Sequence, residues 1–218
     1  MSHQFDWPRF VVVEGPIGVG KTSLVTRLAD RLGYAPLLEA AQENPFLARF
    51  YREGARAAFP TQLFFLFQRM RQLEDLRQGD LFQRRVVADF MLEKDRLFAE
   101  VTLDRDELKL YEEVYGRMAA EAPPPDLVVY LQAPVEVLIT RVRRRDRPEE
   151  RSITADYLRQ LSDAYTRFFT HYDLSPLLII NAATINPVES ASDFELLVER
   201  ILAQRSGRAF FNPTPLLI

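Results

Sequence analysis

Short apolar runs and longer segments with helical spacing alternate along the 218 residues of this chain. The first run, residues 10–13 (Phe-Val-Val-Val), is continuous and rich in β-branched residues, which is typical of a strand buried on both faces. Four later runs have a similar character, and we predict strands at 36–39, 86–89, 127–131 and 177–180. The apolar pattern therefore predicts five strands.

Helical periodicity fills the intervals between these strands. Segment 21–32 places Leu24, Val25, Leu28 and Leu32 on one stripe, and Gly33 follows where a glycine commonly ends a helix. Further helices are predicted at 61–76, 104–120, 135–144, 155–171 and 188–204. Because alternating strands and helices form right-handed crossovers, this order predicts a doubly wound α/β fold with a parallel sheet. We expect a single domain over residues 1–218, with ligands at the carboxyl ends of the strands.

Composition excludes several classes of function. The chain has 28 Lys and Arg against 31 Asp and Glu, so its net charge of −3 gives no sign of a nucleic-acid partner. It has no cysteine, which excludes thiolate metal sites and cysteine nucleophiles, and its two histidines, His3 and His171, are far apart. No apolar run is long enough to span a bilayer, and the N-terminus lacks the apolar stretch of a signal peptide. We expect a cytoplasmic protein with no membrane partner.

A phosphate-binding motif joins the first strand to the first helix. Residues 15–22, Gly-Pro-Ile-Gly-Val-Gly-Lys-Thr, fit the P-loop pattern G-x-x-x-x-G-K-[ST]. The glycines let backbone N–H groups turn toward phosphate oxygens, and the following helix adds the positive end of its dipole. We expect ATP here, with Lys21 on the β- and γ-phosphates and the Thr22 hydroxyl on Mg²⁺. The predicted nucleotide-binding residues are Gly15, Pro16, Ile17, Gly18, Val19, Gly20, Lys21, Thr22 and Ser23.

Asp89 ends the third predicted strand. An acid at this edge of a parallel sheet can hold Mg²⁺, directly or through water. The alternative is a cap for the next helix. Its position on the sheet favours the metal, so Thr22 and Asp89 are the predicted metal ligands.

Polar residues follow the second and third predicted strands at characteristic intervals. They are Glu39, Tyr51, Gln62, Arg69 and Asp95. Tyr51 and Gln62 are eleven positions apart, and Arg69 lies two helical turns beyond Gln62. An arginine-rich segment, 141–152, begins Arg-Val-Arg-Arg-Arg-Asp-Arg-Pro-Glu-Glu. With the P-loop, this order of motifs resembles the deoxynucleoside kinase family (deoxyadenosine, deoxyguanosine and deoxycytidine kinases) over about residues 10–180.

The resemblance implies a P-loop NTPase-type fold with five parallel strands, flanking helices and an arginine-rich lid. It also implies transfer of the γ-phosphate of ATP to the 5′-hydroxyl of deoxyadenosine, deoxyguanosine or deoxycytidine, for nucleotide salvage. Glu39 would be the catalytic base, with Glu43 of the segment Glu-Asn-Pro-Phe as its substitute. Tyr51 would bind the sugar 3′-hydroxyl, and Gln62 the edge of the base.

The remaining residues of the resemblance concern the base and the lid. The pair Arg69 and Asp95 resembles the one in kinases for deoxyadenosine, deoxyguanosine and deoxycytidine. In the lid, at about 141–152, the resemblance implies that Glu150 closes on the 3′-hydroxyl. The arginines that would stabilise the transferring phosphoryl group are Arg141, Arg145 and Arg147. Taken alone, these arginines also fit an exposed basic helix end or an RNA-binding patch, but stacking aromatic residues beside them are absent.

The chain departs from the family at the end of the third strand. Most members have an acidic residue followed by arginine there, and this chain has Asp89-Phe90. The missing arginine normally sits near the 5′-hydroxyl and the phosphate. Our hypothesis is that Lys94, four residues after Phe90, replaces its charge.

Two enzyme classes and one non-enzymatic class compete with this interpretation. A thymidylate kinase has a similar sheet and lid, but it would need extra cations for the phosphate of its substrate. A regulatory P-loop ATPase or GTPase is the second alternative, although no Asn-Lys-x-Asp guanine-binding motif is present. A noncatalytic nucleotide-binding module is the third. The sequence leaves the preferred base open.

The resemblance also implies a homodimer joined through helices that include the predicted helix 61–76. The apolar run Phe64-Phe65-Leu66-Phe67 fits burial of that helix on more than one side. Residues 210–218 are apolar and contain prolines, and they fit packing on the body or on a partner subunit.

Overall fold

The computed structural model describes residues 7–78, 84–119, 122–185, 187 and 190–213. Residues 120 and 188, at the predicted end of one helix and the start of another, lie outside this range, as do residues 214–218 of the apolar tail. Within the described part, no helix combines the length and the apolar character needed to cross a membrane.

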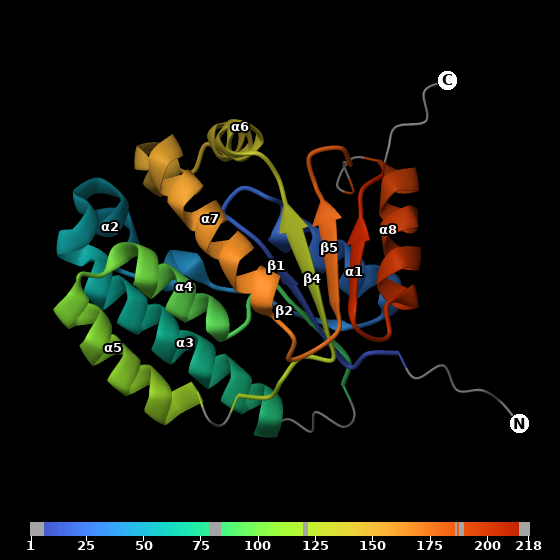
Figure 1. The fold of residues 1–218 in the computed structure, drawn as a ribbon, viewed down its shortest axis with the longest axis horizontal. Helices are drawn as coiled ribbons and strands as arrows, with labels where there is room; N and C mark the ends of the chain where they lie inside the picture. The colour runs from blue at the N-terminus through green and yellow to red at the C-terminus, as the bar shows by residue number, and fades with distance from the viewer. Residues whose placement is uncertain (1–6, 79–83, 120–121, 186, 188–189, 214–218) are drawn as a thin grey trace, which may run out of the picture.

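A single parallel sheet runs through the middle of the molecule (Figure 1). Its strand order is β2-β3-β1-β4-β5-β6, and every neighbouring pair is parallel. The strands are β1 Phe10–Glu14, β2 Ala35–Leu37, β3 Val86–Ala88, β4 Leu127–Gln132, β5 Leu177–Asn181 and β6 Arg208–Phe211. The parallel doubly wound topology is therefore confirmed.

The prediction of five strands was wrong, because β6 adds a sixth strand at one edge of the sheet. Its residues pair with β5 from Leu177↔Arg208 to Ile180↔Phe211. Ala209 and Phe211 pack against the core, whereas Phe210 on the opposite side is 73% exposed. An edge strand that is covered on one face only has no continuous apolar run, so the sequence pattern did not distinguish it from a tail.

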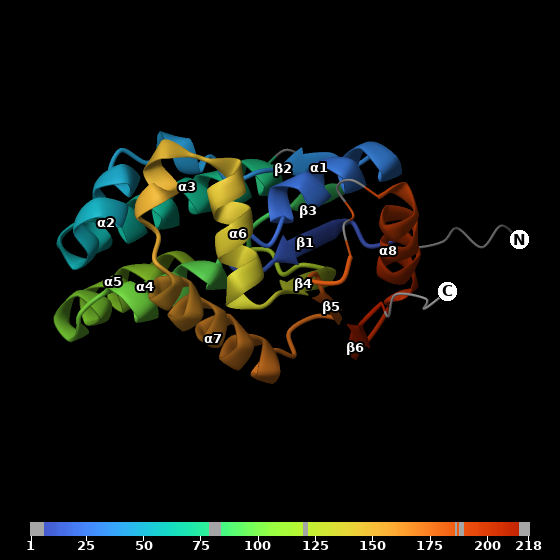
Figure 2. The same ribbon diagram turned by 90° about the horizontal axis from the view of Figure 1, so that it is seen from above.

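Helices cover both faces of the sheet (Figure 2). One face packs against α1 Lys21–Leu32 and α8 Ala191–Ala203. The other packs against α3 Ala58–Gln78, α4 Glu93–Thr102, α5 Arg105–Met118 and α7 Ala155–His171. Two further helices are α2 Leu47–Glu53 and α6 Val135–Arg145.

Alternation along the strands divides the core into two layers. In β1, Val11 and Val13 belong to the layer under α1 and α8, while Phe10 and Val12 belong to the layer under α3, α4, α5 and α7. Both sets are buried, which explains the uninterrupted apolar run in this strand. Because burial on both faces holds the strand firmly, its carboxyl end is a rigid base for the loop that follows.

The sequence pattern missed the short helices α2 and α4. Helix α4 begins with the charged residues Glu93, Lys94 and Asp95. Because two of these charged side chains are themselves buried, the helix has no simple apolar periodicity in the sequence. It ends just before Asp104, whose side chain and that of Glu107 form a capping box at the start of α5. No helix was predicted between residues 89 and 104. Helix α4 nevertheless occupies most of this interval and brings both Lys94 and Asp95 into the interior.

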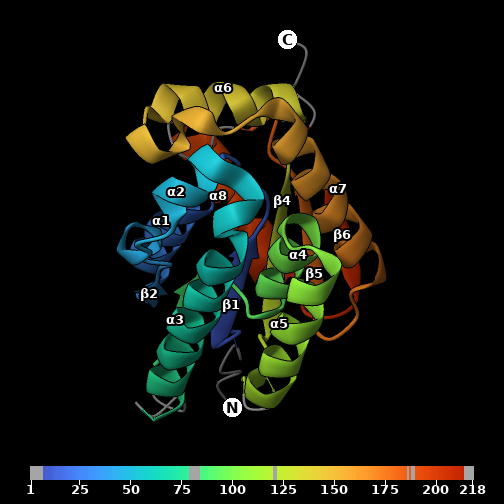
Figure 3. The same ribbon diagram turned by 90° about the vertical axis from the view of Figure 1, so that its left-hand side faces the viewer.

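Helix α6 lies across the carboxyl ends of the strands (Figure 3). It ends at Asp146, which has a left-handed backbone with φ of 48°. A 3₁₀ turn, η4 Pro148–Ser152, then leads toward α7 and packs against α2. The arginine-rich segment therefore covers the edge of the sheet where ligands are expected.

Candidate active site

The P-loop lies close to the backbone of β4 on one side and of α6 on the other. Gly15, Gly18 and Gly20 all have positive φ, of 147°, 86° and 109°. A Cβ on Gly15 would lie 2.4 Å from the Leu131 carbonyl oxygen, and one on Gly18 would lie 2.8 Å from that of Leu138. Only glycine fits these positions, because both the backbone angles and the space exclude a side chain. The loop is thus wedged between β4 and α6.

Lys21 folds back over this loop. Its ammonium donates to the carbonyl oxygens of Gly15, at 2.6 Å, and Pro16, at 3.3 Å. Burial, followed by repulsion from Lys94, lowers the pKa of Lys21 from 10.5 to about 8. An anion bound in the loop would relieve both effects, so the site is suited to phosphate.

Asp89 connects the P-loop to the loop after β2. Its Oδ2 accepts a hydrogen bond of 2.6 Å from the Thr22 hydroxyl, and its Oδ1 accepts one of 2.7 Å from the backbone N–H of Glu39. Asp89 is buried and follows β3 directly. The structure therefore brings together the two predicted metal ligands, Thr22 and Asp89.

Glu39 is held by two cations. Its Oε1 accepts from Arg69, and its Oε2 accepts from the Lys94 ammonium at 3.0 Å. The side chains of Arg69 and Lys94 are each 3% exposed, and that of Glu39 is 15% exposed. Burial opposes the charged carboxylate, but Arg69 and Lys94 outweigh it and lower the pKa of Glu39 to about 2.

Arg69 also reaches the predicted base-binding residues. Its other terminal nitrogen pairs with Asp95 Oδ1, and Asp95 is completely buried behind it. Gln62, two helical turns before Arg69 on α3, donates from Nε2 to the Thr102 hydroxyl at 3.2 Å. Arg69 thus links Glu39 to Asp95 through a single guanidinium group, and Asp95 acts on the site through Arg69.

A cavity of about 390 Å³ contains these groups. This volume is within the usual range for small-molecule sites. The predicted residues that line it are Ile17, Gly18, Gly20, Lys21, Thr22, Ser23, Glu39, Tyr51, Gln62, Arg69, Asp89, Arg145, Arg147 and Glu150. Asp95 and the substitute base Glu43 are not among its lining residues, and Glu43 accepts instead from Gln68 at 3.0 Å.

The lid contributes a compact ion pair to this cavity. Arg145 donates to both carboxylate oxygens of Glu150, with distances of 2.6 to 3.0 Å, and Arg147 lies 3.8 Å from the same group. The lid is therefore folded onto itself, with Glu150 9% exposed at its side chain.

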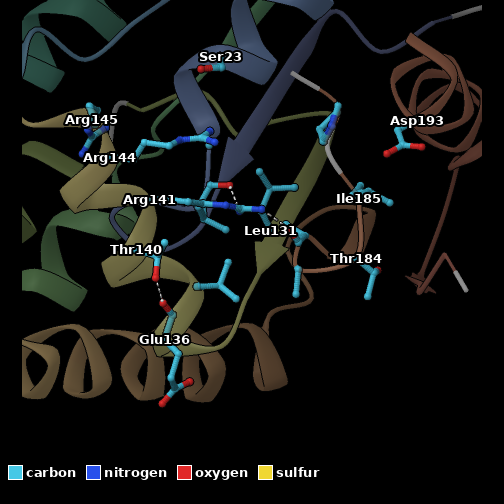
Figure 4. A pocket seen from close by; sticks show the side chains of 17 residues that line it. Ser23, Leu131, Glu136, Thr140, Arg141, Arg144, Arg145, Thr184, Ile185 and Asp193 are labelled. Carbon is cyan, nitrogen blue, oxygen red and sulfur yellow. Dashed lines mark hydrogen bonds between the residues drawn. The ribbon is translucent and has the colours of Figure 1, made fainter. Parts of the chain in front are cut away.

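Arg141 occupies a different place from the other two lid arginines. It lines a second cavity of about 890 Å³, which shares Gly18, Gly20 and Ser23 with the first (Figure 4). There it donates to the carbonyl oxygens of Val19, at 3.2 Å, and Ala182, at 2.8 Å. Arg145 borders both cavities, so the lid lies between them.

Sequence reasoning missed three residues around the site. Glu14, at the end of β1, is completely buried and accepts from the backbone N–H groups of Gly15 and Met91 and from the Tyr165 hydroxyl, each at 3.0 Å. Tyr157 lines the nucleoside-sized cavity, and Thr102 lies beside Gln62. The position of Glu14 immediately before the P-loop was a usable signal, whereas the other two depend on how distant helices pack.

Comparison with known proteins gives one consistent result. The sequence model of the family described as deoxynucleoside kinase matches residues 11–204. The deoxyguanosine kinase of Bacillus subtilis (strain 168) is 33% identical over 199 residues, which cover 88% of this chain and 95% of that protein. The deoxyadenosine/deoxycytidine kinase of the same organism is 26% identical over 209 residues, covering 92% and 94%.

A solved structure has the same fold. The deoxyadenosine kinase from M. mycoides with bound dCTP superposes with a TM-score of 0.76 at 24% sequence identity, covering 88% of this chain and 97% of that one. The same enzyme with bound dATP gives a TM-score of 0.76.

Proposed function

Because this chain belongs to the deoxynucleoside kinase family, we propose that it transfers the γ-phosphoryl group of ATP to the 5′-hydroxyl of a deoxynucleoside and so produces the 5′-monophosphate for nucleotide salvage. One observation carries this conclusion. One cavity of nucleoside size is lined by the P-loop Lys21, by the side chains of Gln62 and Arg69, and by the Glu39 carboxylate. Such an arrangement suits a nucleophile positioned between a phosphate donor and a recognised base.

The donor side needs phosphate ligands and a place for Mg²⁺. Mg²⁺ keeps several waters and takes one or two carboxylates together with substrate phosphates. One carboxylate, Asp89, and one hydroxyl, Thr22, hydrogen-bonded to each other at 2.6 Å, fit that set. Bound Mg²⁺ would neutralise charge that develops on the phosphate oxygens. Lys21 and the backbone of the P-loop would hold the β- and γ-phosphates.

On the acceptor side, Glu39 accepts the proton of the 5′-hydroxyl. Its pKa of about 2 makes it a weak base in the free protein. Phosphoryl transfer passes through a loose transition state, in which little base strength is needed until the new oxygen–phosphorus bond has formed. The role of Glu39 is then to orient the hydroxyl and to take its proton late.

Tyr51 and Glu150 would bind the sugar 3′-hydroxyl, and Gln62 and Arg69 the base, with Asp95 fixing the position of Arg69. Arg145 and Arg147 would turn from Glu150 toward the transferring phosphoryl group when the substrates are bound. Arg141, which lines the second cavity, lies on the donor side of the lid. Arginines suit this task because their planar forks match phosphate oxygens.

Lys94 supplies the cation that the sequence Asp89-Phe90 lacks. Phe90 is completely buried among the apolar side chains of the core and carries no charge. Lys94 reaches the same cavity from the first turn of α4 and contacts Glu39. Its ammonium would stabilise the negative charge that is shared between Glu39, the 5′-oxygen and the phosphoryl group.

Two features of the proposal concern the molecule as a whole. We propose a homodimer that uses α3 and α5, because Phe67 on α3 is 47% exposed and Leu110 on α5 is 51% exposed. We also propose that it works in the cytoplasm, where ATP is available.

Initial rates of ADP production test the proposal. The assay contains ATP, Mg²⁺ and, one at a time, deoxyguanosine, deoxyadenosine, deoxycytidine, thymidine and thymidylate. We expect turnover with one or more of the first three. Turnover with thymidylate alone would move the protein to the monophosphate kinases, and no turnover with any of the five would contradict the proposed function.

A further inference from the structure

Gln62 lines the cavity, and only the nitrogen of its side-chain amide makes a hydrogen bond within the protein. The residue is 2% exposed, and its Nε2 donates to the Thr102 hydroxyl at 3.2 Å. Its Oε1 is buried and has no hydrogen-bond partner. A buried carbonyl oxygen without a donor is costly, so this atom is suited to accept a hydrogen bond from a bound ligand.

The hydrogen bonds of the Thr102 hydroxyl determine the orientation of the Gln62 side-chain amide. A threonine hydroxyl has a single proton, and that of Thr102 is donated to the Phe98 carbonyl oxygen at 2.7 Å. Toward Gln62 the hydroxyl can therefore only accept. An amide turned by 180° would place its oxygen against these lone pairs, so the NH₂ group must face Thr102 and the oxygen must face away.

We propose that Thr102 is a positioning residue for base selection: it orients the Gln62 amide so that the side chain offers an acceptor to an N–H group on the edge of the nucleobase. This inference rests on the proposed function, since it assumes that a deoxynucleoside occupies the cavity. The adjacent Arg69 side chain also lines the cavity and has a buried, unpartnered Nε, which supplies a donor. The resulting pair of acceptor and donor complements a base edge that carries an N–H beside a carbonyl oxygen or ring nitrogen.

The test compares nucleosides that differ at that edge. One pair is deoxyadenosine and purine deoxyriboside, which lacks the 6-amino group. The other is deoxyguanosine and 2-aminopurine deoxyriboside, which lacks the N1–H and the 6-oxo group. The measured quantity is the ratio of kcat/KM within each pair. If adenine is the preferred base, we expect the wild-type kcat/KM to be higher for deoxyadenosine than for purine deoxyriboside. If guanine is preferred, we expect it to be higher for deoxyguanosine than for 2-aminopurine deoxyriboside.

Thr102→Val removes the hydroxyl and keeps the shape of the side chain. We expect it to lower the favoured ratio by about 3- to 10-fold, the effect of one neutral hydrogen bond. Thr102→Ser should keep the wild-type ratio. Thr170→Val is the matched control, because the exposed Thr170 makes the same intrahelical bond, to the Thr166 carbonyl oxygen at 2.7 Å, far from Gln62.

A double-mutant cycle separates orientation from a general effect on the fold. In a Gln62→Met background, Thr102→Val should cause no further change in the ratio. An unchanged ratio in the single variant, or an equal loss in the Gln62→Met background, would overturn the inference. If the valine variant does not fold, Thr102→Ala is measured instead, with the same expected ratio. Absence of any wild-type turnover would overturn the proposed function together with this inference, whereas turnover with an insensitive ratio overturns the inference alone.

Discussion

The ammonium group of Lys94 lies 3.0 Å from Glu39 Oε2, with both side chains inside the cavity that we assign to the nucleoside. We predict that Lys94→Met lowers kcat by about 10²- to 10³-fold, the usual effect of removing one group that stabilises transition-state charge. The KM for ATP should change much less, because the P-loop holds the donor. Steady-state kinetics with both substrates varied measure the two effects.

Arg96 provides the control for Lys94. It lies on the same helix, is exposed, and pairs with Glu100 at 3.1 Å. Arg96→Ala should leave kcat within about twofold of the wild-type value, as is usual for surface positions. Partial recovery of kcat in Lys94→Arg would support a role for the charge, and a wild-type kcat in Lys94→Met would exclude it.

Glu39→Gln should lose about 10²- to 10⁴-fold in turnover, the range typical of general-base catalysis. ATP binding should be retained, because the hydrogen bond that ties Glu39 to Asp89, beside the P-loop, comes from its backbone N–H, which the variant keeps. Titration calorimetry with ATP and single-turnover kinetics distinguish the two steps. Glu43→Gln is the comparison, and we expect near-normal rates because Glu43 does not line the cavity. The reverse outcome would move the base to Glu43.

The affinity of the free protein for ATP should depend on the protonation of Lys21. Its folded pKa of about 8 is below its ordinary value of 10.5. The charged form therefore predominates below pH 8, and affinity should fall as the pH rises through that value. In Lys94→Met one repelling charge is absent, so the decline should move to higher pH. Calorimetry from pH 7 to 9.5 measures ATP affinity against pH for the wild-type protein and for Lys94→Met. If the two affinity curves coincide, Lys94 does not influence the pKa of Lys21.

Protein stability should respond to the same group in the opposite direction. Because the folded pKa of Lys21 is the lower one, the folded protein releases this proton more readily than the unfolded chain. The contribution of Lys21 to the free energy of unfolding should therefore become more favourable as the pH rises from about 8 toward 10.5. Lys21→Met should lack this component in urea titrations.

Asp89→Asn tests the proposed metal site with little change of shape. The asparagine oxygen can still accept from the Glu39 N–H, but its charge is gone. We expect half-maximal turnover to require a Mg²⁺ concentration higher by about tenfold or more. Removing the metal with EDTA should abolish turnover in both proteins. An unchanged Mg²⁺ requirement in the variant would exclude Asp89 as a ligand.

Phe67→Glu tests the proposed dimer. A charge placed in the centre of an apolar interface is costly, so light scattering should show a monomer. Leu174→Glu is the control, because Leu174 is 67% exposed in the turn after α7. If both variants and the wild-type protein have the same mass, the α3 surface has another role.

Local patterns sufficed for much of this fold and site. The P-loop and Asp89 were predicted because each directly follows a strand whose apolar run is uninterrupted, and Glu39 was predicted from the family resemblance. The same runs predicted five of the six strands, β1 to β5, whereas the order in which the strands pair was not predicted. The long helix α3 was predicted to begin at 61, three residues later than its actual start at Ala58.

Features that depend on packing between distant segments were beyond the sequence. Arg69 was predicted to bind the base, but its contact with Glu39 arises only because α3 runs past the loop after β2. Thr102 and Gln62 are brought together by the packing of α4 on α3, and Thr102 belongs to none of the motifs in the sequence. Strand β6 was missed because it has only one face that is even partly buried.

The contact between Gly18 and α6 has a consequence for how the enzyme would open. A Cβ on Gly18 would lie 2.8 Å from the Leu138 carbonyl oxygen and 2.9 Å from Val142 Cγ2, so α6 is packed against the loop that holds the donor through both backbone and side chain. Motion of the arginine-rich segment must then begin beyond this contact, near the left-handed Asp146. The hinge would lie outside the grip on ATP, so nucleoside could exchange with its product while the donor site keeps its shape.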